Sequence, residues 1–309
     1  MKKTLLYLCI WLLMACSAHS GSIYSASFGD KNDPAVIFLH GGPGYNSYSF
    51  EQSTAQKLAS QGYYVIVYDQ RGCGRSKGIA NSRYTFQEAF NDIDSIYKKY
   101  DIHKATLIGH SWGGTLGVLY AEKEPDKVNN LILADAPLSY QKVFRTILSK
   151  CRKIYTEQKS EQLKYIDMLD KMDTASLDYS SYCFMHAMSC NFYKPQNPSP
   201  EATALYKKLK ESKNASLLSD MTKEPVAGFF KNEKYTLLNL TSKIQQLQGK
   251  VRVFGIYGKE DGLFDESNLN NIKQTLGEKN FALIDDASHS VFIDSQEKFI
   301  ETVNTWIKG

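Results

Sequence analysis

The stretch Thr106-Leu107-Ile108-Gly109-His110-Ser111-Trp112-Gly113-Gly114 decides how this chain folds. It joins the apolar run 105–108 to a helical pattern that begins at Thr115. A Gly-x-Ser-x-Gly turn between a strand and a helix is typical of a nucleophile elbow, which exposes the serine hydroxyl above a sheet. Such a turn needs Gly109 and Gly113, because a Cβ at either position would collide with the crossing backbone. The five-residue pattern also arises by chance, so an ordinary strand–helix turn is the alternative, and the rest of the chain decides between them.

Buried strands and amphipathic helices alternate on both sides of this turn. Apolar runs predict strands, and a 3.6-residue periodicity predicts helices. The predicted strands are 35–39, 63–68, 128–134, 251–257 and 280–284, and the predicted helices are 50–60, 85–100, 266–276 and 296–308. Alternation of this kind favours right-handed βα units. We therefore predict an α/β fold with a mostly parallel sheet and helices on both faces.

The alternation stops after Asp135-Ala136-Pro137 and resumes near residue 251. The block between them is largely helical in pattern and contains no convincing buried strand. We interpret residues 138–241 as a helical lid over the carboxyl edge of the sheet. The core would then be built from two parts of the chain, residues 24–137 and 242–309.

The N-terminal stretch predicts export. Two lysines precede the apolar segment Leu5–Met14, which is short for a membrane span. Its end, Leu13-Met14-Ala15-Cys16, resembles a bacterial lipobox. We therefore predict a signal peptide over residues 1–15, a lipidated Cys16 and a tether over 16–23. The mature protein would be an extracytoplasmic lipoprotein, held on a bacterial membrane by its lipid chains.

Ordinary signal cleavage near Ala18 or Ser20 is the alternative, and it would give a soluble periplasmic or secreted protein. Either route leads to a compartment that permits disulfides. Within the lid, Cys183 and Cys190 are close enough in sequence to pair, or either joins Cys151, or the thiols stay free. The cysteines that remain beyond Cys16 are Cys73, Cys151, Cys183 and Cys190. No Cys/His spacing is typical of a zinc site.

Size and charge limit the classes of function. The 309 residues, 42% of them hydrophobic, are enough for one sizeable globular domain with an insertion. The 37 basic and 33 acidic residues give a formal net charge of +4, and no basic cluster is interleaved with aromatic residues. This balance argues against a nucleic-acid partner.

Three predicted strand ends carry Ser111, Asp261 and His289 in that chain order, which is the order of an α/β-hydrolase triad. A serine is a weak nucleophile unless a base takes its proton, and an imidazole titrates near neutral pH, so His289 is the predicted base. Asp261 would fix the imidazole tautomer and stabilise the imidazolium. The backbone amides of Gly42 and Trp112 are the predicted hydrogen-bond donors to the oxyanion.

Other polar residues compete with these assignments. Asp135 ends the strand before the lid, where some hydrolases place their acid. We favour Asp261, because it follows the penultimate strand while the histidine follows the last one. The acidic pair 285–286 is too near the histidine in sequence to be a first choice. We interpret His40 and His110 as structural residues that brace the loops around the nucleophile.

Three motifs carry a resemblance to a known family. They are His40-Gly41-Gly42-Pro43-Gly44, Asp69-Gln70-Arg71-Gly72-Cys73-Gly74-Arg75-Ser76 and Gly109-His110-Ser111-Trp112-Gly113-Gly114. They resemble the proline iminopeptidase family of α/β-hydrolases over about residues 23–137 and 251–309. The resemblance implies a serine aminopeptidase that removes an N-terminal residue, often proline, from short peptides. It implies no metal or cofactor, and a helical lid that limits access to small substrates.

The chain departs from this family where the substrate's free amine is recognised. Members use acidic residues, commonly lid glutamates, and some carry one directly after the triad aspartate, where this chain has Gly262. The acidic candidates in the lid are Glu201, Glu211, Glu224 and Glu233, and none matches a family motif. An ammonium group buried in a pocket needs a counter-charge. The alternatives are therefore an esterase, lactonase or amidase without amine recognition, or a surface-displayed binding protein that keeps the fold without catalysis.

Overall fold

The computed structural model describes residues 21–309 and contains a seven-stranded sheet in the order β1-β3-β2-β4-β5-β6-β7. The strands are β1 (Ser25–Phe28), β2 (Ala35–Leu39), β3 (Tyr64–Tyr68), β4 (Ala105–His110), β5 (Val128–Ala134), β6 (Arg252–Gly258) and β7 (Phe281–Ile284). β1 pairs antiparallel with β3, and every other neighbouring pair is parallel. The predicted α/β fold with a mostly parallel sheet is confirmed.

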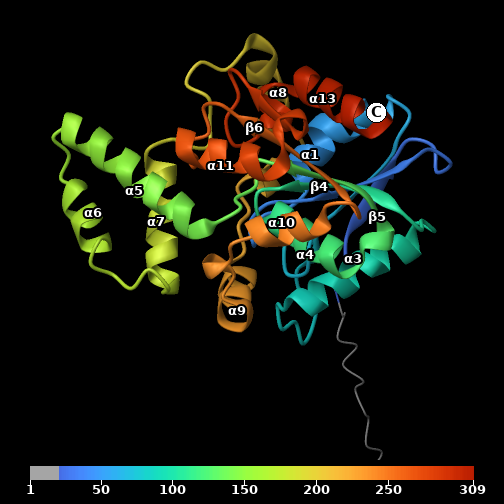
Figure 1. Ribbon diagram of the computed structural model, residues 1–309, viewed down its shortest axis with the longest axis horizontal. Coiled ribbons are helices and arrows are strands. Elements are labelled where there is room, and N and C mark those ends of the chain that lie inside the picture. The colour runs from blue at the N-terminus through green and yellow to red at the C-terminus, as the bar shows by residue number, and fades with distance from the viewer. Residues whose placement is uncertain (1–20) are drawn as a thin grey trace, which may run out of the picture.

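Helices cover both faces of this sheet (Figure 1). In the core they are α1 (Tyr48–Phe50), α2 (Gln56–Ala59), α3 (Phe86–Lys99), α4 (Trp112–Lys123), α10 (Thr241–Leu247), α11 (Glu266–Leu276), α12 (Val291–Asp294) and α13 (Gln296–Lys308). A π-helical turn, Glu51–Ala55, joins α1 to α2. Figure 1 shows α3, α4 and α10 below the sheet and α1 and α13 above it.

Alternating side chains of the strands fill two separate cores. In β2, Ile37 and Leu39 join the core that packs against α3 and α4, whereas Val36 and Phe38 join the core under α13. All five residues of β2 are buried, as expected for a central strand covered on both faces. This explains why the strands of the sheet centre appear in the sequence as continuous apolar runs.

The parallel register brings the carboxyl ends of the central strands to one edge. Leu39 of β2 pairs with Gly109 of β4, and Ala134 of β5 pairs with both His110 of β4 and Ile256 of β6. Ligands of open parallel sheets bind at this edge, outside the carboxyl ends of the strands. The loops that follow β2, β4, β5 and β6 therefore meet in one place.

The inserted helical region lies between β5 and β6. Its helices are α5 (Tyr140–Glu157), α6 (Leu163–Leu169), α7 (Leu177–Ser189), α8 (Pro200–Lys210) and α9 (Lys223–Glu233). In Figure 1, α5, α6 and α7 form a group that projects from the sheet, while α8 returns beside α13. Across residues 21–309, no helix has the length and apolar character needed to span a membrane.

The signal peptide 1–15, Cys16 and the first part of the tether 16–23 lie outside the described residues. The described chain contacts the core from its start, because Gly21 N donates to Gly78 O at 3.4 Å. The antiparallel edge strand β1 is an addition to the predicted elements. Its sequence, Ser-Ala-Ser-Phe, is short and polar, and only its pairing with β3 makes it a strand.

Candidate active site

The sharp turn at Ser111 lies between β4 and α4. Ser111 has φ 51° and ψ −119°, a left-handed conformation that is uncommon for a non-glycine residue. A Cβ added at Gly109 would lie 2.6 Å from the carbonyl oxygen of Gly113, and one at Gly113 would overlap the Leu39 carbonyl. The two glycines therefore permit the close crossing of backbone on which the turn depends. Ser111 itself is partly exposed, while its neighbour Trp112 is fully buried.

His289 and Asp261 form a buried hydrogen-bonded pair. The distance from His289 Nδ1 to Asp261 Oδ2 is 2.7 Å, and the exposed fractions of the two residues are 6% and 2%. A carboxylate accepts, so Nδ1 carries the proton and Nε2 is left as the basic nitrogen. Burial lowers the pKa of His289, but the charge and hydrogen bond of Asp261 outweigh it, and the pKa lies above its ordinary value.

Asp135 contacts backbone rather than the imidazole. Its carboxylate accepts hydrogen bonds from Gly258 N at 2.8 Å and Val291 N at 3.2 Å. Burial, followed by the charge of Asp261, raises the pKa of Asp135 well above its ordinary value. Asp135 thus ties the loop after β5 to the start of the Asp261 loop and to α12. Of the two candidate acids, the structure brings only Asp261 into contact with His289.

His110 connects the nucleophile turn to the histidine loop. Its Nε2 donates to the carbonyl oxygen of His289 at 2.6 Å, and the two rings are 5.0 Å apart. Burial and the neighbouring His289 lower the pKa of His110 to about 3, so it stays neutral. No hydrogen bond joins Ser111 Oγ to His289 within residues 21–309. Such contacts are often long without substrate and shorten in the complex.

The predicted oxyanion donors lie on either side of Ser111. A Cβ added at Gly41 would lie 3.3 Å from the Ser111 Cβ, so the loop after β2 runs directly beside Ser111. Gly42 has φ 135°, and Trp112 is the first residue of α4, where backbone N–H groups lack a helical acceptor. Neither amide donates a hydrogen bond to another group in the described part of the chain.

A buried network holds this loop in place. His40 Nε2 accepts from Gln70 N at 2.8 Å, and its Nδ1 donates to Gly41 O at 2.8 Å. Gln70 in turn donates from its amide to His40 O and accepts from Trp112 Nε1. Burial lowers the pKa of His40, which keeps the imidazole neutral in this bridging role. The interpretation of His40 as a loop-bracing residue agrees with these contacts.

Two other residues of the Asp69–Ser76 motif, Asp69 and Arg75, also have a structural role. The buried Asp69 carboxylate accepts from Ser47 N, from Arg75 N and from Arg75 Nε, the last at 2.8 Å. Burial alone would raise the pKa of Asp69, but the Arg75 hydrogen bonds outweigh it and the pKa is lowered. Sequence reasoning singled out this loop without a role, and its role here is to join β3 to the segment before α1.

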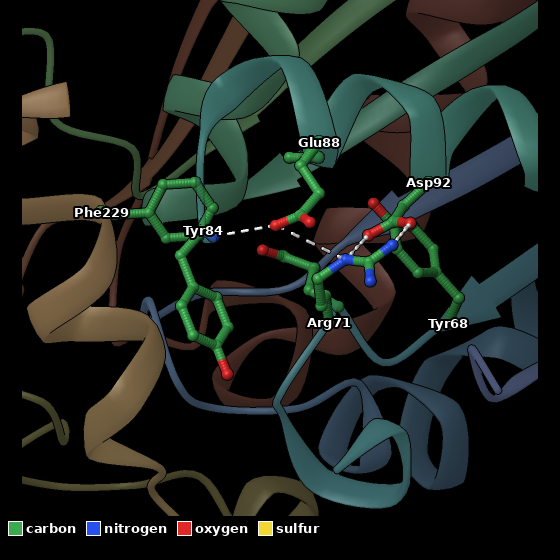
Figure 2. A pocket seen from close by; sticks show the side chains of 8 residues that line it. Tyr68, Arg71, Tyr84, Glu88, Asp92 and Phe229 are labelled. Carbon is green, nitrogen blue, oxygen red and sulfur yellow. Dashed lines mark hydrogen bonds and ion pairs between the residues drawn. The ribbon is translucent and has the colours of Figure 1, made fainter. Parts of the chain in front are cut away.

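The other arginine of the motif lines a small cavity shown in Figure 2. Arg71 lies between Asp92 and Glu88 of α3, with its Nε 3.0 Å from Asp92 Oδ2 and 3.7 Å from Glu88 Oε2. The cavity measures about 10 Å³, room for about one water molecule. Ser111, Asp261 and His289 do not line it. It is therefore too small, and wrongly placed, to hold a substrate for these residues.

Two lid residues cover the histidine side of the site. The carbonyl oxygen of Phe192 accepts from Gly262 N at 3.0 Å and from Ser288 Oγ at 3.1 Å. The Tyr193 ring lies edge-on to the His289 ring with their centroids 5.1 Å apart. A Cβ added at Gly262 would overlap the Phe192 ring, so a side chain at 262 needs this ring to move. Sequence reasoning did not identify either aromatic residue, because nothing in the local pattern places them here.

The four lid glutamates that could bind a substrate amine are either exposed or hydrogen-bonded to the backbone. Glu201, Glu211 and Glu224 are exposed, and Glu233 accepts from Phe86 N at 2.7 Å at the start of α3. The charged lid side chain beside the Asp261 loop is instead Lys150 of α5. Its Nζ donates to Phe264 O at 2.6 Å. Burial lowers the pKa of Lys150, and the nearby carboxylates of Asp261 and Asp265 oppose this effect.

Comparison with known proteins agrees with this geometry. Residues 34–296 match the model of the alpha/beta hydrolase fold family. The chain belongs to the α/β-hydrolase family. This hydrolase is 25% identical over 296 residues to a proline iminopeptidase of Lactobacillus delbrueckii subsp. bulgaricus, covering 92% of this chain and 93% of the relative. The resemblance to proline iminopeptidases is thereby confirmed.

Solved structures extend the comparison. The proline iminopeptidase of Mycobacterium smegmatis superposes with a TM-score of 0.66 at 17% identity, over 94% of this chain and 96% of that one. The enol-lactonase of Burkholderia xenovorans LB400 superposes with a TM-score of 0.61 at 18% identity, over 94% and 98%. At these identities the structures establish a shared fold, and that fold serves both peptide and lactone chemistry.

Proposed function

We propose that this protein is a serine hydrolase in which Ser111 attacks the carbonyl carbon of the substrate. The observation that carries the proposal is the 2.7 Å hydrogen bond from His289 Nδ1 to Asp261 Oδ2. This bond leaves His289 Nε2 available to take the hydroxyl proton. The position of Ser111 on the strained turn between β4 and α4 is the one that a nucleophile of this fold requires.

In the first half-reaction, Ser111 Oγ bonds to the carbonyl carbon while His289 takes its proton. The negative charge moves to the carbonyl oxygen, where the amides of Gly42 and Trp112 donate hydrogen bonds. His289 then gives the proton to the leaving group as the carbon–leaving-group bond breaks, and an acyl-enzyme remains. A water molecule, activated by His289, releases the acid and restores the serine. Asp261 stabilises the imidazolium at both steps.

Within this class we propose an aminopeptidase that releases N-terminal proline or a small apolar residue from short peptides. The support is the proline iminopeptidase relative, which aligns over 92% of this chain. A further support is that the side chains of Phe192 and Tyr193 lie against Gly262 and His289, where they would limit the size of the substrate. The substrate ammonium would need a carboxylate partner in the pocket.

A second candidate is an esterase, lactonase or amidase that ignores the free amine. The observation that favours it is the surroundings of Gly262, because the Phe192 ring occupies the space of a side chain there. The charged lid residue beside the acid loop is also a lysine, Lys150, rather than a carboxylate. A cation in that position would oppose a substrate ammonium.

The test is a hydrolysis panel. It compares proline, alanine and leucine arylamides, each with a free and an acetylated amine, with short acyl esters. An aminopeptidase cleaves the free-amine arylamides at least about tenfold faster than the acetylated ones, because a buried ammonium–carboxylate contact is lost on acetylation. Equal rates on the two forms, together with fast ester cleavage, would support the second candidate. Ser111→Ala is the control and should remove all of these activities.

We also propose that the mature protein is anchored to a bacterial membrane through a lipidated Cys16, on its extracytoplasmic side. The support is the sequence Leu13-Met14-Ala15-Cys16 after a short apolar segment. Intact mass of the membrane-extracted protein should show an N-terminal Cys16 carrying lipid. A soluble product that begins near Ala18 or Ser20 would contradict the anchor and leave the hydrolase proposal untouched.

A further inference from the structure

Two cysteines of the lid face each other beside the segment that covers His289. Cys151 lies in α5 and Cys190 follows α7, and their Sγ atoms are 3.0 Å apart. Both are free thiols in this structure. A disulfide bond is about 2.05 Å long. Side-chain rotations that bring the two sulfur atoms about 1 Å closer would therefore allow the bond to form. We propose that Cys151 and Cys190 form a disulfide that fixes the lid segment 190–193 over the triad.

The two thiols have unequal surroundings. Cys190 is partly exposed, whereas Cys151 is fully buried. When Cys190 is a thiolate, the single S–H of Cys151 can point to it instead of to the His186 carbonyl oxygen. The hydrogen bond from the Cys151 thiol lowers the pKa of Cys190 to about 7, with a further contribution from the Tyr155 hydroxyl against the effect of burial. Cys190 is therefore the nucleophilic thiolate near neutral pH and reacts first, and Cys151 is the thiol that reacts second.

The oxidant is a small disulfide such as oxidised glutathione. Cys190 thiolate attacks one sulfur of this disulfide, a mixed disulfide forms, and one glutathione thiolate leaves. Cys151 then bonds to the Cys190 sulfur, and its proton passes to the second glutathione as that leaves. Two protein thiols have lost two electrons and two protons, and one small disulfide has become two thiols. No other group of the protein changes oxidation state.

The bond would act on the site through a short segment of chain. Phe192, two residues after Cys190, accepts hydrogen bonds from Gly262 N and Ser288 Oγ, and Tyr193 packs against the His289 ring. A disulfide would join this segment to α5, whose Lys150 and Thr146 already contact the loop 261–265. The effect on hydrolysis rests on the proposed function, whereas formation of the disulfide does not.

The test measures the bond itself before any activity. The purified full chain is incubated with oxidised glutathione or with a reductant, and its remaining thiols are then alkylated in denaturant. Peptide mass mapping of the oxidised sample should find Cys151 joined to Cys190. The link closes a loop across 39 positions, so the melting temperature should rise by about 5 °C over the reduced protein. For hydrolysis, we expect kcat on a bulky arylamide to change at least twofold between the two forms.

Matched serine variants complete the experiment. Cys151→Ser and Cys190→Ser should each lose the link and both oxidation-dependent effects. Cys183→Ser changes a buried thiol of α7, the helix that Cys190 follows, and should keep them. The proposal is overturned if the full chain keeps all its thiols under oxidised glutathione, or if the link joins Cys183. A link that changes neither melting temperature nor kcat overturns the claim that it fixes the lid. If the link forms on oxidation but neither the oxidised nor the reduced protein hydrolyses any substrate, the result would instead count against the proposed function.

Discussion

The core and the lid bury their apolar side chains to different extents. In the core, Ile37 and Leu107 of the sheet and Trp112 of α4 are fully buried, and the exposed fraction of Phe38 is 1%. Within residues 21–309, seven of the eight exposed large apolar residues lie instead between residues 138 and 241: Tyr165, Met168, Tyr182, Met185, Met188, Met221 and Leu237. The core thus holds a fixed geometry, whereas the lid keeps exposed apolar surface that includes flexible methionine side chains.

The charged pairs of the two regions differ in the same way. In the core, the fully buried Asp69 carboxylate binds Arg75 through several hydrogen bonds. In the lid, Arg152 contacts Asp167 and Asp170, and all three side chains are more than one third exposed. A buried, fully hydrogen-bonded pair is costly to break, whereas an exposed one contributes little. If chemistry belongs to the core and adaptability to the lid, substitutions in the two regions should differ in both size and kind of effect.

Replacing the nucleophile should have the largest effect. In Ser111→Ala we expect hydrolysis to fall by at least about 10⁴-fold, because the covalent step is lost. Steady-state kinetics with an arylamide and an ester measure the loss. Circular dichroism should show an unchanged fold, since an alanine keeps the backbone of the turn. A variant that retains a tenth of the activity would place the chemistry elsewhere.

Substitutions of the two candidate acids, Asp261 and Asp135, should differ in their effect on kcat. Asp261→Asn should lower kcat by about 10³- to 10⁴-fold, because the imidazole loses the partner that sets its tautomer. Asp135→Asn should change kcat less than about tenfold, since an amide oxygen still accepts from Gly258 N or Val291 N. Parallel kinetics on the two variants decide the acid. The opposite ranking would assign the role to Asp135.

Activity should depend on pH through His289. The base must be neutral, and its pKa is raised by Asp261, so protonation persists to a higher pH than for an ordinary histidine. The plot of kcat/KM should fall about tenfold per unit below a midpoint that lies above about 6.5. In Asp261→Asn the residual activity should show a lower midpoint, because the charge that raises the pKa is removed. If the midpoint is the same in Asp261→Asn as in the unchanged protein, Asp261 does not raise the pKa of His289.

The lid–core contact at Gly262 should be sensitive to a single methyl group. Gly262→Ala places a Cβ against the Phe192 ring, so we expect unfolding to be easier by about 1–3 kcal/mol. Adding Phe192→Ala opens space for that Cβ, and the double variant should cost less than the sum of the two single variants. Chemical denaturation of the four proteins in this cycle measures the coupling. Additive effects would mean that the ring does not fill this space in solution.

The exposed ion pairs of the lid should contribute least. In Arg152→Ala we expect a loss of stability below about 1 kcal/mol, because the contacts to Asp167 and Asp170 are solvent-screened. Thermal melts at low and high salt check this, and the small difference should shrink as salt rises. A loss of several kcal/mol would mean that the ion pairs of the lid stabilise the protein as strongly as those of the core.

Sequence patterns predict the structure where an element is formed by neighbouring residues or is buried among apolar side chains. The elbow around Ser111 is readable because a strand, a Gly-x-Ser-x-Gly turn and a helix are adjacent in the chain. The central strands are readable because burial on both faces demands continuous apolar runs. The edge strand Ser25–Phe28 lacks such a run, since one short antiparallel pairing makes it a strand. The lid is readable as helical, but its amphipathic patterns do not say which residues face the site.

By itself, the sequence determined the order of the candidate triad along the chain and its placement at strand ends, because local patterns of hydrophobicity and turn residues encode both. Only the tertiary structure decided that Asp261, and not Asp135, contacts His289. It also decided that Phe192 occupies the space beside Gly262 and that Cys151 faces Cys190. These facts are contacts between residues 28 to 70 positions apart, and packing in three dimensions sets them.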